Sequence, residues 1–137
     1  MAEMSARLEW KGGKSFEGVS GSGHAVMMDG DREKGASPME TLLMGMGGCT
    51  SVDVVFILER MREQVTGCVA EIQAIRADED PKVFTKIHIH FVVTGKGLTA
   101  DKVARAVELS ATKYCSASIM LGKTAEITHD FEIKEAA

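Results

Sequence analysis

The stretch Met39–Leu58 constrains this chain more than any other feature, because nearly every residue in it is apolar. It reads METLLMGMGGCTSVDVVFIL, and only Glu40 and Asp53 carry a charge. Two carboxylates and several glycines are unusual in a helix that crosses a bilayer. A helix that is apolar around most of its circumference can instead lie inside a protein. The stretch therefore predicts a central buried helix and not a membrane span.

A helix this apolar needs cover on every side, and a chain of 137 residues with short strands supplies little of it. Two copies of the chain that wrap their sheets around two such helices would provide that cover. Gly45, Gly47 and Gly48 each cost roughly 1 kcal/mol relative to Ala inside a helix, and a close helix–helix contact would offset this cost. We therefore expect a homodimer.

The residues before the apolar stretch predict where its helix begins. Ser37 is a suitable N-cap, Pro38 suits the first helical position, and Glu40 completes a capping box with Ser37. We expect the helix to run from residue 38 to about Glu63, with Gly67 closing it.

Short segments of alternating polar and apolar residues flank this helix and predict strands. Gly12-Gly13 favours a hairpin between the first two of them. A later helix begins at Thr99, with Val103, Ala106, Val107 and Tyr114 on its apolar face. This order predicts an α+β fold in a single domain, 1–137. The expected strands cover residues 7–10, 15–19, 24–28, 68–76, 83–94 and 126–133, and a short helix covers 115–121.

Charge and cysteine content narrow the function. Lys and Arg number 16 and Asp and Glu number 20, for a net charge of −4, so the chain lacks the basic stripe of a nucleic-acid binder. The first residues, MAEMSARLEWKGG, contain no apolar signal segment. The 3 cysteines are an odd number, which favours free thiols in a reducing cytoplasm over a disulfide framework.

Two of the three thiols have settings that favour reactivity. Cys49 follows Gly47-Gly48, which leaves space around its sulfur, and Cys115 precedes a short predicted helix. A helix N-terminus lowers the pKa of a thiol, and the nearby Lys113 would add to this effect. Cys68 opens a predicted strand with an apolar face, as is usual for a buried, inert cysteine. The alternative is that all three are small core residues.

Three other polar residues leave their roles open. His88 and His90 lie on one face of a predicted strand, a spacing that can bind a metal, although no third ligand is evident and a polar sheet face is the simpler explanation. Asp53 follows Cys49 by one helical turn and could be a buried partner or a polar contact across the dimer.

The thiols and the helix start together resemble a known family. The chain resembles the OsmC/Ohr family of osmotically inducible and organic hydroperoxide resistance proteins. The residues that carry the resemblance are Ser37-Pro38-Met39-Glu40 and Cys49 on a long apolar helix, followed by Tyr114-Cys115 and Ser118. The resemblance covers the whole chain and is closest to the YhfA-like branch. It implies an OsmC-like fold, in which antiparallel sheets wrap around long central helices in an intertwined homodimer with active sites at the subunit interface.

The resemblance also implies a chemistry. Characterised members are peroxiredoxin-like thiol peroxidases of oxidative stress defence, which reduce organic hydroperoxides and, more weakly, hydrogen peroxide. By position, Cys49 matches the thiol that attacks the peroxide, Cys115 the resolving thiol and Glu40 the active-site glutamate. An external dithiol would restore both thiols. The reaction would need no metal and no organic cofactor, and we expect no nucleic acid and no membrane as partners.

The sequence departs from the family at one position. The family pairs an arginine with its glutamate to stabilise the thiolate. In one branch this arginine follows the Gly-Gly of the first hairpin, where this chain has Lys14. In another branch the arginine lies in the loop before the long helix, where the nearest arginine of this chain is Arg32, which is out of register. Lys lacks the planar fork of Arg. We expect Arg32, ahead of Lys14, to face Glu40. The alternative function is an OsmC-like binding or stress protein without efficient peroxidase activity.

Overall fold

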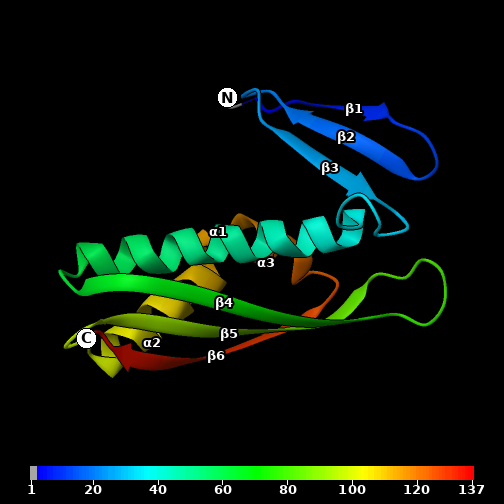
Figure 1. Ribbon diagram of the computed structural model, residues 1–137. Helices are drawn as coiled ribbons and strands as arrows, with labels where there is room; N and C mark the ends of the chain where they lie inside the picture. The colour runs from blue at the N-terminus through cyan, green and yellow to red at the C-terminus, as the bar shows by residue number, and fades with distance from the viewer. Residues whose placement is uncertain (1–2) are drawn as a thin grey trace. The chain divides into compact units, whose positions relative to one another are not determined.

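The apolar stretch forms α1 (Pro38–Arg60) in a computed structural model that describes residues 3–137 (Figure 1). The capping box is complete: the Ser37 hydroxyl accepts the Glu40 N–H at 3.1 Å, and the Glu40 carboxylate accepts the Ser37 N–H at 2.9 Å. The expectation that Gly67 closes the helix is wrong. Arg62 adopts a φ of 64°, which turns the chain out of the helix, and Gly67 lies inside the next strand.

Contacts divide the chain into two units, 1–44 and 45–137. The first contains β1 (Ala6–Trp10), β2 (Ser15–Ser20) and β3 (Ala25–Asp29) in one antiparallel sheet of order β1-β2-β3. Gly12 and Gly13 both have positive φ, at 101° and 54°, as the predicted hairpin requires.

The second unit is built on a sheet of order β4-β5-β6, formed by β4 (Gln64–Arg76), β5 (Phe84–Lys96) and β6 (Glu126–Glu135). β4 and β5 are antiparallel, as expected. β6 instead runs parallel to β5, so the sheet is not fully antiparallel. The helices between them carry the chain back to the start of β5, and parallel neighbours need such a crossover. The expected α+β class is confirmed.

The crossover consists of α2 (Ala100–Leu109), the π-helix η1 (Ser110–Tyr114) and α3 (Ser116–Leu121). Val103, Ala106 and Val107 are buried, as the helical spacing predicts. Tyr114 is 51% exposed, because the wider π-helical turn shifts it off the apolar face.

The core of the second unit lies on one face of its sheet. Alternate residues of β5 point into it, together with the buried side of α2 and one side of α1. At Gly47 a Cβ atom would lie 2.5 Å from the end of the Ile72 side chain, so the glycine lets α1 approach β4 closely. The main buried side chains are Met46, Val54, Leu58, Ile87, Ile89, Phe91, Val93, Val103 and Val107.

The other side of α1 stays uncovered in the single chain. Only 28% of its most apolar 18-residue window is buried, and by length and composition alone the helix is long enough to cross a membrane. Val52 is 68% exposed and Phe56 55% exposed. Within residues 3–137, no atom beyond the adjoining residues and the helix's own nearby backbone lies within 4 Å of a Cβ built on Gly45 or Gly48. The expected burial on every side is therefore not achieved by one copy.

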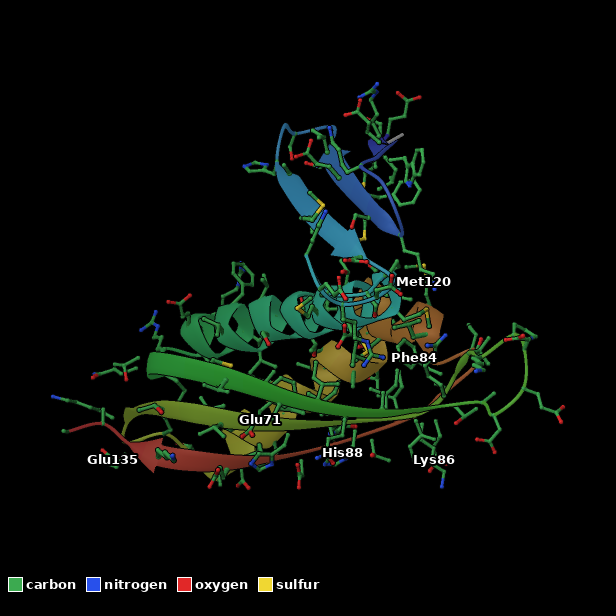
Figure 2. The ribbon with its side chains drawn as sticks, turned by 45° about the vertical axis from the view of Figure 1, so that its right-hand side comes forward. Glu71, Phe84, Lys86, His88, Met120 and Glu135 are labelled. Carbon is green, nitrogen blue, oxygen red and sulfur yellow. The ribbon has the colours of Figure 1, made fainter. Side chains whose placement is uncertain are left out.

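The opposite face of the sheet is polar, and Figure 2 shows Glu71, Lys86 and His88 on the side away from the helices. His90 Nδ1 lies 2.7 Å from Asp130 Oδ1, and its Nε2 lies 3.3 Å from Glu132 Oε1. His88 shares the same Asp130 oxygen at 3.1 Å. The sequence suggested no carboxylate for this histidine pair because Asp130 and Glu132 reach it only through the parallel pairing of β6 with β5.

This network makes stability depend on pH. Hydrogen bonds to Asp130 and Glu132 raise the pKa of His90, and the His90 bond lowers the pKa of Asp130. A raised folded-state pKa means that protonated His90 stabilises the fold below its unfolded pKa of about 6.5, and that this contribution is lost as the pH rises through the folded value. The unfolding free energy of the wild type should therefore fall between about pH 6 and pH 8.

Urea denaturation of wild type and His90→Gln at both pH values checks this expectation. His90→Gln should flatten the fall. His24 lies in the turn between β2 and β3, where its ring bonds the Ser22 hydroxyl, so His24→Gln should retain the fall. An equal fall in His90→Gln would show that the network does not control the pH dependence.

Candidate functional site

The structure brings Cys49 and Cys115 together, although they are far apart in the sequence. Cys49 lies in the middle of α1, and Cys115 is the residue just before α3. Their sulfur atoms and a carboxylate oxygen of Asp53 all lie within 4.8 Å of one another. Cys49 and Asp53 share a face of α1 because they are four residues apart. Two thiols and one carboxylate thus form a single cluster inside the second unit.

A buried hydrogen-bond network holds Asp53 in this cluster. The Ser110 hydroxyl donates to Asp53 Oδ2 at 3.1 Å and lies 2.7 Å from the Thr50 hydroxyl. Ser110 is fully buried and is the first residue of η1, and its carbonyl accepts the Cys115 N–H at 2.8 Å. The π-helical turn therefore connects Asp53 on α1 to the backbone of Cys115.

Cys115 is fully buried, and Ser118 is its hydrogen-bond partner. The Ser118 hydroxyl donates to Cys115 Sγ at 3.1 Å and the Ser118 N–H donates at 3.3 Å. Burial raises the pKa of the Cys115 thiol, the two Ser118 donors oppose this shift, and the neighbouring Cys49 adds to it. The expected lowering of this pKa is therefore wrong, because desolvation outweighs the helix start. Lys113 is not among the groups that shift this pKa, and its ammonium lies over the Tyr114 ring at 5.3 Å.

Cys49 and Cys68 differ in their surroundings. Cys49 is half-buried, and the space beside the preceding Gly48 is open, as the glycine pattern predicts. Cys68 lies on β4 outside the cluster and is half-buried rather than fully enclosed. Burial raises the pKa of the Cys68 thiol. Of the three thiols, two therefore share a site and the third does not.

Glu40 has two partners in the first unit. Arg32 Nε lies 3.6 Å from its Oε1, a single contact between two exposed side chains and not a bidentate pair. The Ser37 N–H, with a smaller contribution from Arg32, lowers the pKa of Glu40. Lys14 pairs instead with Asp31 at 3.4 Å. Of the two candidate cations, Arg32 is the one that contacts Glu40.

The loop that carries Arg32 is organised by Asp29, which is 3% exposed. The Asp29 carboxylate accepts the N–H groups of Asp31 at 2.8 Å and Lys34 at 3.0 Å, and these bonds lower the pKa of Asp29. Arg32 itself has a positive φ of 60° and donates its N–H to the Asp29 carbonyl. The charged run from residue 29 to 34 is therefore an ordered loop.

Two clefts of the second unit border the thiol cluster. One, of about 420 Å³, is lined in part by Thr50, which follows Cys49 on α1, and by Ser118, which donates to Cys115 Sγ. The other, of about 560 Å³, has Asp53 and Arg60 as the charged residues of its lining. Its apolar and aromatic lining is Phe56, Ile57, Met61, Leu109 and Tyr114.

Sequence reasoning missed several residues of this arrangement. Ser110 carries no local signal, because a serine at a helix end is ordinary, and only its contact with α1 gives it a role. Ser118 was part of the thiol motif without an assigned function. Asp29 belongs to a run of charged residues and therefore drew no separate prediction. The available signal was its position at the start of a Gly-containing loop, where an aspartate often accepts hydrogen bonds from the backbone N–H groups that follow.

Comparisons with known proteins agree with this architecture. Residues 29–130 match the profile of the family described as OsmC-like protein. The chain is 48% identical over 134 residues to Protein YhfA of Escherichia coli K12, covering 97% of this chain and 100% of that protein.

Solved structures show the same fold. A hypothetical protein from Aquifex aeolicus VF5 has a TM-score of 0.91 at 28% identity, with 100% of both chains covered. The organic hydroperoxide resistance protein OhrB of Bacillus subtilis has a TM-score of 0.64 at 15% identity, covering 96% of this chain and 98% of that one, a likeness of fold alone.

The Ser118 hydroxyl should control the acidity of Cys115. Ser118→Ala removes one of two donors to the sulfur, so the pKa of Cys115 should rise further, because the thiolate loses a hydrogen bond. Ultraviolet absorbance of the thiolate against pH, in a Cys49→Ser, Cys68→Ser background, measures this value for Cys115 alone. Ser116→Ala, an exposed neighbour, is the matched control. An unchanged titration in Ser118→Ala would exclude this role.

Proposed function

Because the chain belongs to the OsmC-like protein family, we propose that it is a thiol-dependent peroxidase that reduces organic hydroperoxides. The observation that carries the proposal is the approach of the Cys49 and Cys115 sulfurs to within 4.8 Å. A disulfide has an S–S length of about 2.05 Å, so small movements of the two side chains would join them. The hydroperoxide resistance named for the Bacillus subtilis neighbour is consistent with this activity.

Cys49 is the nucleophile in this proposal, because it is the more accessible of the two clustered thiols. Its thiolate attacks the distal oxygen of the hydroperoxide, the O–O bond breaks, and the leaving alkoxide takes a proton and departs as the alcohol. Cys49 is oxidised to a sulfenic acid. The peroxide is reduced by two electrons in this step.

Cys115 then resolves the sulfenic acid. Its sulfur attacks Cys49 Sγ, the S–OH bond breaks, and water and a Cys49–Cys115 disulfide are the products. Ser118 would stabilise the attacking thiolate through its two hydrogen bonds. Asp53, with a carboxylate oxygen within 4.8 Å of the sulfur, would accept the thiol proton through one bridging water or after a closer approach. An external dithiol reduces the disulfide and restores both thiols, which suits a cytoplasmic protein.

Arg32 and Glu40 complete the proposed site from a second copy of the chain. Cys49 follows Glu40 on α1 by nine residues, which span about 13.5 Å along a helix axis and about half a turn around it. An antiparallel α1 of a partner subunit could bring the partner's Arg32–Glu40 pair to the thiols. The cation would then favour the Cys49 thiolate.

The uncovered side of α1 supports this dimer. It combines exposed apolar side chains with two glycines that have open space beside them. An apolar helix face this large is unusual on a monomer and typical of a permanent interface. Glycines would let two such helices approach at close range.

The cleft that Asp53 helps to line suggests the substrate class. Its lining is mainly apolar and aromatic, so it would bind the hydrocarbon part of a hydroperoxide, leaving the peroxide group near the thiols. An apolar organic hydroperoxide would therefore be preferred to hydrogen peroxide.

Turnover with cumene hydroperoxide and a dithiol reductant tests the proposal. The wild type should consume the peroxide, Cys49→Ser should lose turnover to background, and Cys115→Ser should stop after one equivalent of oxidation. Cys68→Ser, which changes a thiol outside the cluster, should leave turnover unchanged. Absence of turnover in the wild type would favour the alternative, an OsmC-like binding or stress protein.

The same assay separates the two candidate cations. Arg32→Ala should lower the turnover more than Lys14→Ala, because only Arg32 contacts Glu40 and Lys14 pairs with Asp31. Equal effects of the two substitutions would overturn the assignment of Arg32.

The dimer gives a separate prediction. Light scattering should report twice the mass of one chain. The interface between the two copies should bury well over ~2,000 Å² in total. Val52→Arg places a charge on the uncovered face of α1 and should produce monomers, whereas Ala104→Arg, at an exposed site on α2, should not. A wild type that stays monomeric at micromolar concentration would exclude this interface.

A further inference from the structure

The thiol cluster has a second chemical property, because its three donor atoms are also metal ligands. Within residues 3–137 it is the one grouping of three His, Cys, Asp or Glu ligand atoms that lie within 4.8 Å of one another. Cysteine sulfur and carboxylate oxygen are each ligand atoms that zinc binds in proteins. Cys115 is fully buried and the other two are half-buried, so such an ion would be largely enclosed.

We propose that Cys49, Asp53 and Cys115 form a binding site for a thiophilic divalent metal ion such as Zn²⁺ when both thiols are reduced. Zinc takes sulfur at about 2.3 Å and oxygen at about 2.0–2.2 Å, so tetrahedral ligand atoms lie about 3.5–3.8 Å apart. Ligand atoms that lie within 4.8 Å of one another need to approach by at most about 1.3 Å to reach this geometry. Three protein ligands leave the fourth position to water or another small ligand.

The surroundings of the donors suit a metal. Ligands of protein metal sites are usually held by hydrogen bonds to an outer layer of residues. Here Ser110 donates to Asp53 Oδ2 at 3.1 Å, and Ser118 donates twice to Cys115 Sγ. Ser110 is itself bonded to Thr50, which keeps the Asp53 carboxylate directed toward the sulfurs. Two of the three ligands therefore have fixed positions before a metal arrives.

Binding involves proton release and no electron transfer. Each thiol gives up its proton, two metal–sulfur bonds form, and the Asp53 carboxylate supplies the third bond, so the occupied site carries one negative charge. A disulfide between Cys49 and Cys115 has no thiolate to offer, which makes metal binding and oxidation mutually exclusive. The site does not require the proposed peroxidase activity, and a bound ion would protect both thiols from peroxide.

Titration of the fully reduced chain with Co²⁺, followed by competition with Zn²⁺, tests the site. One Co²⁺ per chain should produce the sulfur-to-metal charge-transfer band and the visible bands of a tetrahedral thiolate complex. Both signals should disappear when Zn²⁺ displaces Co²⁺. They should also be absent after the two thiols form a disulfide, and in the Cys49→Ser and Cys115→Ser variants. Ser110→Ala, which removes an outer partner, should weaken binding by about 10-fold, and Asp53→Asn, which removes a ligand, should weaken it more.

Two controls separate this site from other metal-binding groups. Cys68→Ser should bind as the wild type does, and so should His88→Gln with His90→Gln, which removes the histidines of the sheet surface. Zn²⁺ should also slow iodoacetamide labelling of Cys49 in the unmodified protein, a result that needs no variant to fold.

Absence of the charge-transfer band in the reduced wild type, or an unchanged affinity for Co²⁺ in Asp53→Asn, would overturn the proposal. Neither result bears on peroxide turnover, which is measured with a chelator present. Conversely, if the chain binds Zn²⁺ but does not reduce peroxide, the metal site is supported and the proposed peroxidase activity is contradicted.

Discussion

Burial of one side of α1 against the β4-β5-β6 sheet is the constraint on which the second unit depends. Met46, Val54 and Leu58 are completely buried there, and Gly47 lets the helix approach Ile72. Complete burial of a Leu or Val side chain stabilises a fold by about 1.5–3 kcal/mol. The burial of these three side chains therefore outweighs the free-energy cost of the glycines in the helix. The same packing fixes which residues of α1 face the crossover helices, and therefore where Cys49 and Asp53 lie.

The contact between α1 and η1 converts this packing into a chemical site. Thr50 and Ser110 are sixty residues apart in the sequence, yet their hydroxyls lie 2.7 Å apart in the core. A buried polar pair of this kind is stable only when its hydrogen bonds are satisfied, so it specifies one register between the two elements. In that register Asp53 accepts a bond from Ser110, and Cys115 follows η1 directly. Peroxide reduction and metal binding, as proposed, would use this one juxtaposition.

Much of the local structure could be predicted from the sequence. The capping box at Ser37 and Glu40, the Gly12-Gly13 hairpin and the buried face of α2 involve residues close together in the chain, so short-range periodicity and turn chemistry identify them. The prediction failed where long-range contacts act. β6 is parallel to β5 because a helical crossover separates them, and Asp130 reaches His90 only through that pairing. Tyr114 leaves the apolar face because a π-helical turn replaces the expected α-helical one.

For the candidate site, the sequence by itself singled out two thiols, a capping glutamate and an arginine in the loop before the helix as candidates, and it left the role of Asp53 open. Only the tertiary structure decided their relationships. It placed Asp53 beside both sulfurs, paired Arg32 and not Lys14 with Glu40, and enclosed Cys115 so that burial raises its pKa despite the helix that follows. Desolvation and distance depend on every element packed around a group, and residue type and spacing along the chain do not contain that information.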